Sequence, residues 1–287
     1  MNQQFTEIAD IYLTTRCDMN CVFCYANKSE GNLSLQQFND IADLLWKNGS
    51  RIIGITGGEP LLHEDVVKAC SYAKAVGFQT ILYTNGNKLT KDMLALLAPN
   101  IDWFALSLDG FEEVNKIIGR TSNHHETIFR VIEEINYNYP SCKVRLTTVV
   151  TKQNISDVEK IAQSLLEKRL RIGFWSIKQM LPTRKGKTIY NEFGFSEEEF
   201  NRNMTEILNQ YGGHIPIRLR NLSDKSGDIM CVHVNGLCTT TIKENNDYRI
   251  ISLGNILEDC ENTLMKWNQY KSSVNSGGYY ESWNSAI

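Results

Sequence analysis

The sequence lacks the features that would insert it into a membrane, export it or bind it broadly to duplex nucleic acid. It has no uninterrupted apolar stretch near the length that a membrane span needs. Its first residues, Met-Asn-Gln-Gln-Phe-Thr-Glu, contain no basic segment followed by an apolar core and a cleavage site. The net charge of -3 gives no broad basic surface. We therefore expect a cytoplasmic protein with reduced cysteines and neither membrane nor nucleic-acid partners.

The chain also has no internal repeat and no low-complexity segment. Its 287 residues, 42% of them hydrophobic, can bury one sizeable core plus an extension. Short apolar runs predict strands at 10–15, 51–56, 78–84, 102–108, 143–150 and 171–177. Longer amphipathic runs between them predict helices at 35–48, 64–76, 91–98, 126–137 and 156–168. Strict alternation implies parallel strands with right-handed crossovers, so we predict an α/β fold with a partial (β/α)6 barrel.

Three of the predicted helices have clear start signals. Ser34 followed by Gln37 has the pattern of a capping box, and Thr90 and Asn154 have the residue types of good N-caps. These signals support the predicted helix starts.

Cys17, Cys21 and Cys24 follow the first predicted strand closely. A short loop lets three sulfurs at this spacing converge on three corners of a 4Fe-4S cluster, which leaves the fourth iron open to a small molecule. A structural zinc site wants four ligands, and the closest downstream histidine, His63, lies in a different motif. A disulfide requires an oxidising compartment. The spacing favours the iron-sulfur interpretation, with zinc and then a disulfide as alternatives.

Four more motifs follow, each at the carboxyl end of a predicted strand. They are Gly57-Gly58-Glu59-Pro60, Thr84-Asn85-Gly86, Ser107-Leu108-Asp109-Gly110 and the segment 148–154. Each is an ordinary turn when taken alone. Parallel barrels carry their chemistry at this end of the strands. In order behind Cys-x-x-x-Cys-x-aromatic-Cys, with Phe23 as the aromatic residue, they resemble the radical S-adenosylmethionine (radical SAM) superfamily over about residues 8–185.

The resemblance implies a cofactor and a role for each motif. The cluster on the three cysteines reduces bound S-adenosylmethionine and yields a 5′-deoxyadenosyl radical, with a flavodoxin- or ferredoxin-type protein as electron donor. Gly57 and Gly58 let backbone approach the cofactor, and Glu59 accepts its amino group. The remaining predicted cofactor contacts are Phe23, Asn85, Ser107, Asp109, Arg120 and Thr151.

A second part follows the barrel. The segment 180–187 contains Pro182 and a short basic turn, which divides the chain into a barrel at 1–187 and an α+β extension at 188–287 that covers the barrel mouth. In the extension we predict a helix at 196–211 with a Ser196 and Glu199 capping box, and a helix near Trp267. Strands are expected at 215–219, 228–234, 237–242 and 248–253, with Asn235-Gly236 as a hairpin turn. The tail from Gly277 has low predicted order.

The extension resembles a degenerate SPASM or Twitch module, whose extra cysteines bind auxiliary clusters. Thr241 stands where the hairpin would carry a cluster cysteine, and Cys231, Cys238 and Cys260 remain. We therefore expect one 4Fe-4S cluster and no auxiliary one, with Cys231 or Cys238 as a candidate hydrogen-atom donor. The alternative is an auxiliary cluster on these three thiols with a non-cysteine fourth ligand. The other cysteines and the histidines are expected to be structural or surface residues: Cys70, Cys142, His124, His125 and His233.

The SPASM-like extension favours a peptide substrate, modified by cross-linking, thioether formation or epimerisation. The alternative is a small molecule, as in a sugar, nucleoside or aminoglycoside epimerase or dehydrogenase. This alternative is expected because no separate leader-binding domain precedes the barrel. A non-catalytic iron-sulfur or zinc-binding module is the remote alternative.

Overall fold

One sheet organises the protein, whose computed structural model describes residues 8–26, 31–223, 229–244 and 247–273. The strand order is β10-β9-β8-β1-β2-β3-β4-β5-β6-β7. The strands are β1 (Ile8–Thr14), β2 (Ile52–Gly57), β3 (Gln79–Thr84), β4 (Trp103–Ser107), β5 (Lys143–Val150), β6 (Phe174–Gln179), β7 (Ile217–Arg220), β8 (Met230–Val232), β9 (Leu237–Glu244) and β10 (Asp247–Asn255). Strands β1 to β6 lie side by side in chain order, and all of their pairings are parallel.

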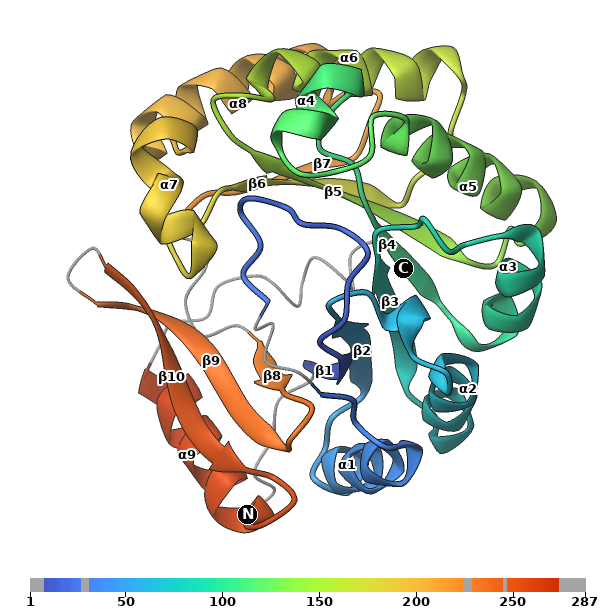
Figure 1. Cartoon of the computed structure of the whole chain (residues 1–287), viewed down its shortest axis with the longest axis vertical. Helices are drawn as coiled ribbons and strands as arrows, with labels where there is room; N and C mark the ends of the chain where they lie inside the picture. Colours follow the sequence, from blue (N-terminus) through green and yellow to red (C-terminus); the bar gives the residue numbers. More distant parts are fainter. Residues whose placement is uncertain (1–7, 27–30, 224–228, 245–246, 274–287) are drawn as a thin grey trace.

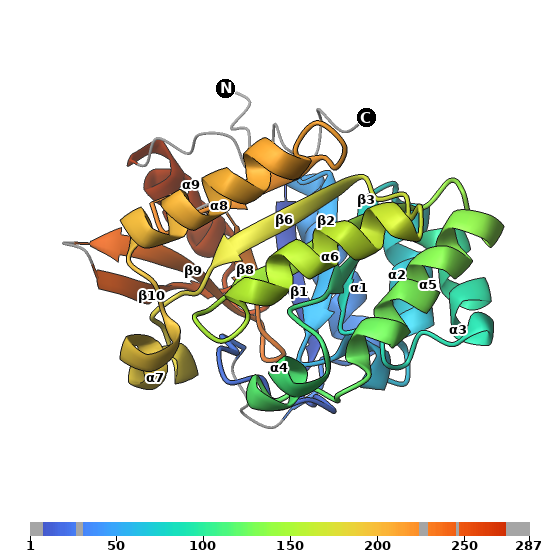
Figure 2. The same ribbon diagram turned by 90° about the horizontal axis from the view of Figure 1, so that it is seen from above.

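The sheet curves, and helices cover its outer face (Figure 1). The helices are α1 (Leu35–Lys47), α2 (Val66–Val76), α3 (Lys91–Leu97), α4 (Glu112–Ile117), α5 (His124–Asn138), α6 (Ile155–Glu167), α7 (Lys185–Phe193), α8 (Glu197–Tyr211) and α9 (Cys260–Ser273). Figure 2 shows α5, α6 and α8 running along the outside of the curved sheet. The α/β partial barrel predicted from the sequence is therefore confirmed.

The two faces of the sheet bury different side chains. On β1, Ile11 and Leu13 belong to the large core between sheet and helices. Ile8, the first residue of β1, belongs to a separate small cluster with Trp103 and Phe174, which are the first residues of β4 and β6. That cluster fills the amino end of the inner face, since alternate residues of a strand face opposite sides. The inner face nearer the carboxyl ends carries polar residues.

Two helices differ from the sequence prediction. The segment expected as a short basic turn instead begins α7 at Lys185, and α4 follows β4 directly. They are six and nine residues long, and the N-cap side chain of neither helix makes a cap hydrogen bond, so neither has a clear start signal in its sequence. Strand β6 also begins at Phe174, three residues later than predicted.

Three of the four predicted helix caps make the expected side-chain hydrogen bonds. The Ser34 and Ser196 capping boxes and the Thr90 cap are confirmed. Asn154 occupies the N-cap position of α6 as predicted, but its side chain makes no cap hydrogen bond. Its amide instead donates to the carbonyl oxygens of Asp109 (2.7 Å) and Val149 (2.8 Å), which ties two strand ends together.

The second part of the chain adds strands at both edges of the barrel sheet. β7 pairs in parallel with β6, while β8 pairs in parallel with β1. β8 and β9 form the expected hairpin, with Gly236 at a φ of 81°. The division at residue 187 and the covering of the mouth stay predictions. The start of the strand expected at 228–234 and the tail from Gly277 lie outside the described residues.

Candidate active site

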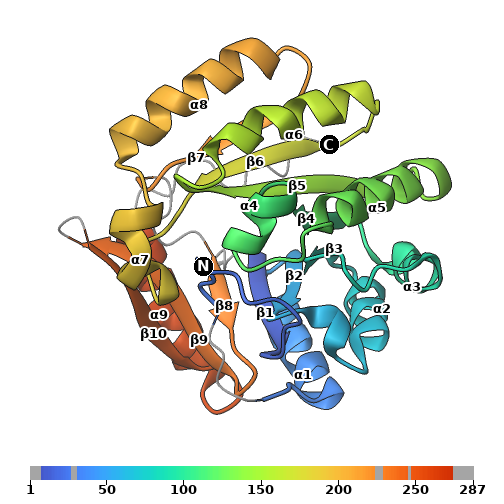
Figure 3. The ribbon, with the colours of Figure 1, turned by 45° about the horizontal axis from the view of Figure 1, so that its top comes forward.

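The cysteine loop follows β1 and lies within the curve of the sheet (Figure 3). Cys17, Cys21 and Cys24 are free and partly buried. The backbone N–H of Met19 donates to Cys17 Sγ at 3.5 Å. Burial raises the pKa of the Cys17 and Cys21 thiols, while the positive charge of Arg120 lowers that of Cys21. A nearby guanidinium and an N–H donor favour thiolate ligands, so this donor set fits an iron-sulfur cluster.

Within the described part of the chain, no three His, Cys, Asp or Glu side chains gather closely enough to hold one metal ion.

A turn after α4 supports the cysteine loop from one side. The N–H groups of Asn20 and Val22 donate to the carbonyls of Gly119 (3.2 Å) and Ile118 (3.1 Å). Gly119 has a φ of 82°, and a Cβ there would overlap Asn20 O and lie 2.8 Å from its carbonyl carbon. Lys185 of α7 adds a 2.6 Å hydrogen bond to Asn20 Oδ1.

The turn after β3 holds the loop from the other side. Asp18 accepts hydrogen bonds from the side chains of Asn85 (2.6 Å) and Asn87 (3.2 Å). Asn85, predicted to bind the cofactor, thus positions the cysteine loop in this structure. Its carbonyl contacts Nε2 of the buried His124 at 2.7 Å. Burial and the charge of Arg120 lower the pKa of His124 to about 3, so this histidine is neutral and donates here.

The glycines at the end of β2 pack against the start of the loop. A Cβ on Gly57 would overlap Thr14 O, and one on Gly58 would overlap Arg16 O. The N–H groups of Gly58 and Glu59 donate to those same two carbonyls, both at 2.7 Å. Chain packing alone therefore demands glycine at 57 and 58. Their approach to the cofactor stays a prediction.

Glu59 is fully buried and joins two of the motifs. Its Oε1 accepts from the Thr84 hydroxyl (2.7 Å) and Leu61 N–H (3.1 Å), and its Oε2 accepts from Asn85 N–H (2.7 Å). Burial raises its pKa to about 7, although these three hydrogen bonds favour the ionised form. Glu59 thus aligns the turn after β3, and its contact with the cofactor amino group stays a prediction.

Asp109 and Arg120 form a buried ion pair beside the cysteines. Asp109 Oδ1 also accepts from Val149 N–H at 2.6 Å, so the pair links the ends of β4 and β5. Thr151 is buried, and its hydroxyl contacts Asn154 Oδ1 at 3.1 Å. Ser107 and Phe23 are partly buried near the same strand ends. The structure therefore gathers the predicted residues at one end of the barrel, while their cofactor contacts stay predictions.

The extension's cysteines lie in different surroundings. Cys231 pairs with Asp10 of β1, so its side chain lies on the same inner face of the sheet as Asp10. Cys238 is fully buried in the large core between sheet and helices. Cys260 begins α9. Of the two candidate hydrogen donors, Cys231 is the one on the inner face. The donor role and the missing auxiliary cluster stay predictions.

The other predicted structural residues are confirmed. Cys70 and Cys142 are buried, as are His124 and His125. Asp18, Gly119 and His124 were not predicted to support the cysteine loop.

A sequence profile of the radical SAM superfamily matches residues 11–165. The chain belongs to this superfamily, and membership implies a 4Fe-4S cluster and S-adenosylmethionine. It is 31% identical over 208 residues to an S-adenosylmethionine-dependent nucleotide dehydratase of Flammeovirga pacifica, covering 67% of this chain and 69% of that protein. It is 28% identical to an Fe-coproporphyrin III synthase of Methanosarcina barkeri, covering 63% of this chain and 45% of the synthase. It is thus similar to enzymes with different substrates.

Solved structures share the fold at low sequence identity. SuiB of Streptococcus suis bound to S-adenosylmethionine superposes with a TM-score of 0.69 at 18% identity, covering 95% of this chain and 68% of SuiB. anSMEcpe with bound AdoMet and a Kp18Cys peptide gives a TM-score of 0.69 at 15% identity, covering 92% and 82%. These similarities confirm the α/β architecture of radical SAM enzymes.

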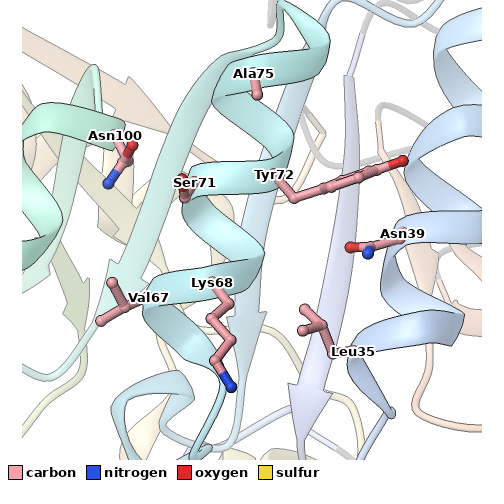
Figure 4. A pocket seen from close by; sticks show the side chains of 8 residues that line it. All are labelled: Leu35, Asn39, Val67, Lys68, Ser71, Tyr72, Ala75 and Asn100. Atoms are coloured by element: carbon pink, nitrogen blue, oxygen red, sulfur yellow. The ribbon is translucent and has the colours of Figure 1, made fainter.

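A surface pocket of about 500 Å³ lies away from these motifs, along α2 (Figure 4). Tyr72 of α2 points toward Leu35 and Asn39 of α1, while Val67 and Ser71 lie on the side of α2 that faces Asn100. It is on the outer side of the sheet and takes no part in the site. No helix in the described ranges is both long and apolar enough to cross a membrane.

Proposed function

We propose that this radical SAM enzyme abstracts a hydrogen atom from a small anionic molecule, with a nucleotide as the specific candidate. The observation that carries the proposal is a group of cations on the inner face of neighbouring strands. They are Arg145 on β5, Lys178 on β6 and Arg218 on β7.

Two of these cations, Arg145 and Arg218, lie at the same aromatic ring, and Lys178 and Arg218 are partly buried. Arg145 is 1% exposed, and its guanidinium carbon is 5.4 Å from the centre of the Phe174 ring. The guanidinium of Arg218 lies 4.2 Å from the same ring. Burial and then the charge of Arg145 lower the pKa of Arg218. Like charges repel strongly in a medium of low dielectric constant, and a bound anion would relieve that repulsion.

Sequence similarity makes a nucleotide the first anion to test. The Flammeovirga pacifica relative, at 31% identity, carries the name nucleotide dehydratase. A nucleotide has phosphates that match guanidinium and ammonium donors. The predicted alternative of a nucleoside-type substrate is therefore favoured over a neutral sugar.

The chain's own residues would bind and orient the reactants. When bound, the cluster and S-adenosylmethionine supply the 5′-deoxyadenosyl radical that is general to this superfamily. Cys17, Cys21 and Cys24 would hold the cluster at the carboxyl end of β1. The cations of β5 to β7 would hold the substrate below it, and such orientation contributes much of the rate of an enzymatic step. We expect a cytoplasmic flavodoxin- or ferredoxin-type protein to supply electrons.

The test measures 5′-deoxyadenosine by mass spectrometry after anaerobic reconstitution and reduction with dithionite. Each of the four ribonucleoside triphosphates and each matching nucleoside is added separately with S-adenosylmethionine. We expect one triphosphate to raise the rate at least tenfold and its nucleoside to have little effect. A nucleoside that matches its nucleotide, or four inactive triphosphates, would overturn the proposal.

Two lysine variants separate the cation group from general charge effects. Lys178→Met should lose the stimulation by the triphosphate. Lys143→Met is the matched control, because Lys143 lies at the amino end of β5, with its ammonium 5.3 Å from the Trp103 ring centre. This variant should keep the stimulation. Equal losses in both variants would argue against specific anion binding by Lys178.

The peptide substrate predicted first from the sequence is the competing proposal. It rests on the SPASM-like extension, because the solved structures with peptides share only the fold at 15–18% identity. A short peptide that stimulates 5′-deoxyadenosine formation, with no response to any nucleotide, would replace the nucleotide proposal.

A further inference from the structure

Asp10 is a buried acid on the inner face of β1. The residue is 6% exposed, and its Oδ1 has no hydrogen-bond partner within the part of the chain that the structure describes. Leaving a buried oxygen atom unpaired is unfavourable, because it loses its hydrogen bonds to water and gains none in the protein. A chain that needed only packing at this position would carry an apolar residue.

Gly54 on the neighbouring strand makes room for this carboxylate. Asp10 and Gly54 are paired in the register of β1 and β2. A Cβ on Gly54 would overlap Asp10 Oδ1 and lie 2.7 Å from Cε2 of Tyr83. The unpaired oxygen therefore occupies space that any side chain at position 54 would fill.

The surroundings of Asp10 are mostly cationic or neutral near pH 7. Arg145 of β5 and Lys178 of β6 favour its ionised form. The Tyr83 ring of β3 lies beside the carboxylate. Burial opposes them and raises the pKa of Asp10 to about 7. Tyr12 of β1 and Cys231 of β8 complete the surroundings, and burial raises the pKa of both well above the usual range.

Asp10 lies below the reacting centre. It stands four residues before the end of β1, which corresponds to about 13 Å along a strand. A molecule that reaches from the cysteine loop to the cations of β5 and β6 would pass this carboxylate. A contact at that depth would select the substrate, while the reacting bond stays near the cluster.

Building on the proposed function, we propose that Asp10 is a specificity-determining residue whose free oxygen accepts a hydrogen bond from a hydroxyl or amino group of the bound nucleotide. The neighbouring Arg145 and Lys178 hold the phosphates of the same molecule. The Asp10 carboxylate thus binds a hydroxyl or amino group of the substrate, and the two cations bind its phosphates.

The test is calorimetric titration of the reconstituted enzyme with S-adenosylmethionine present, using the four ribonucleoside triphosphates. The tightest binder is then compared with its 2′-deoxy, 3′-deoxy and deaminated analogues. Asp10→Ala should weaken binding of the parent nucleotide at least tenfold. One analogue should show the same loss with the unchanged enzyme and no further loss with Asp10→Ala. That non-additivity is the signature of a direct contact.

Asp10→Asn is the second variant, since it keeps the shape and removes the charge. Affinity of the unchanged enzyme should rise between pH 6 and pH 8 as Asp10 ionises, because the ionised carboxylate is the stronger acceptor. The Asn variant should lack this part of the rise, while ionisation of the nucleotide phosphate affects both proteins alike. Cluster content and circular dichroism check that both variants fold.

The outcomes separate the two proposals. An unchanged enzyme that binds no nucleotide overturns the proposed function together with this inference. Nucleotide binding that both Asp10 variants retain within twofold overturns only the role of Asp10. An equal extra loss for every analogue in Asp10→Ala would assign Asp10 a structural role and also overturn the inference.

Discussion

Replacing Gly119 by alanine should impair assembly of the cluster without touching any cysteine. The new Cβ would overlap Asn20 O in the cysteine loop, and the φ of 82° is unfavourable for alanine by about 1–2 kcal/mol. The two hydrogen bonds from the loop to Gly119 and Ile118 contribute about 1 kcal/mol each. The combined cost is about 3 kcal/mol, which lowers the equilibrium constant for docking of the loop by a factor of roughly 100.

Iron content after anaerobic reconstitution is the measurement. The unchanged protein should bind about four irons per chain, and Gly119→Ala should bind fewer than half as many under identical conditions. Gly213→Ala is the matched control, since a Cβ at Gly213 meets no atom within 4 Å. Full iron content and an unchanged spectrum of the reduced cluster in Gly119→Ala would refute the idea that this turn supports the cysteine loop.

Three further changes test other contacts. Arg120→Met leaves the buried Asp109 charge unpaired, so the free energy of unfolding, measured in urea, should fall by about 3–5 kcal/mol. Lys116→Met removes an exposed ion pair and should lower it by under about 1 kcal/mol. Equal effects of the two changes would contradict burial of the Asp109 and Arg120 pair. The pKa of Asp10 is raised to about 7 from 3.8, so the folded state binds more protons than the unfolded state and loses stability as pH rises through 7. The melting temperature of Asp10→Asn relative to the unchanged protein should therefore increase from pH 5 to pH 8, and a flat difference would oppose the assignment. Asn154→Ala removes the hydrogen bonds to Asp109 O and Val149 O and should cost about 2 kcal/mol in urea denaturation, while a loss under 0.5 kcal/mol would mean that these bonds contribute little.

Much of the barrel could be predicted because each strand and helix has a local signature. Strands buried on both faces appear as short apolar runs, and the helices between them have an apolar stripe. Helix α7 lacks a start signal, since the side chain of its N-cap residue Arg184 makes no cap hydrogen bond and the helix begins Lys-Gly-Lys. The attachment of β7 and β8 to opposite edges of the sheet could not be predicted either, because no local pattern specifies a strand's partner.

The site residues show the same division. The three cysteines lie within eight residues of one another, and each strand-end motif is a short run of neighbouring residues. Local sequence spacing was therefore enough to find them. Asp18 and Asn85 are 67 residues apart, and their contact depends on the whole fold. Gly57 and Gly58 were predicted to let backbone approach the cofactor, which stays a prediction. The atoms that approach them in this structure are the carbonyl oxygens of Thr14, at the end of β1, and Arg16, at the start of the cysteine loop.

The pairing of β8 with β1 and of β7 with β6 also bears on how the protein can be handled. A fragment ending at residue 187 would leave both outer strands of the six-stranded sheet with unpaired backbone N–H and C=O groups. Open edges of this kind template aggregation between chains. Strands β7 and β8 thus cover the edges of β6 and β1. We expect a chain shortened to residue 187 to aggregate before its activity could be assayed.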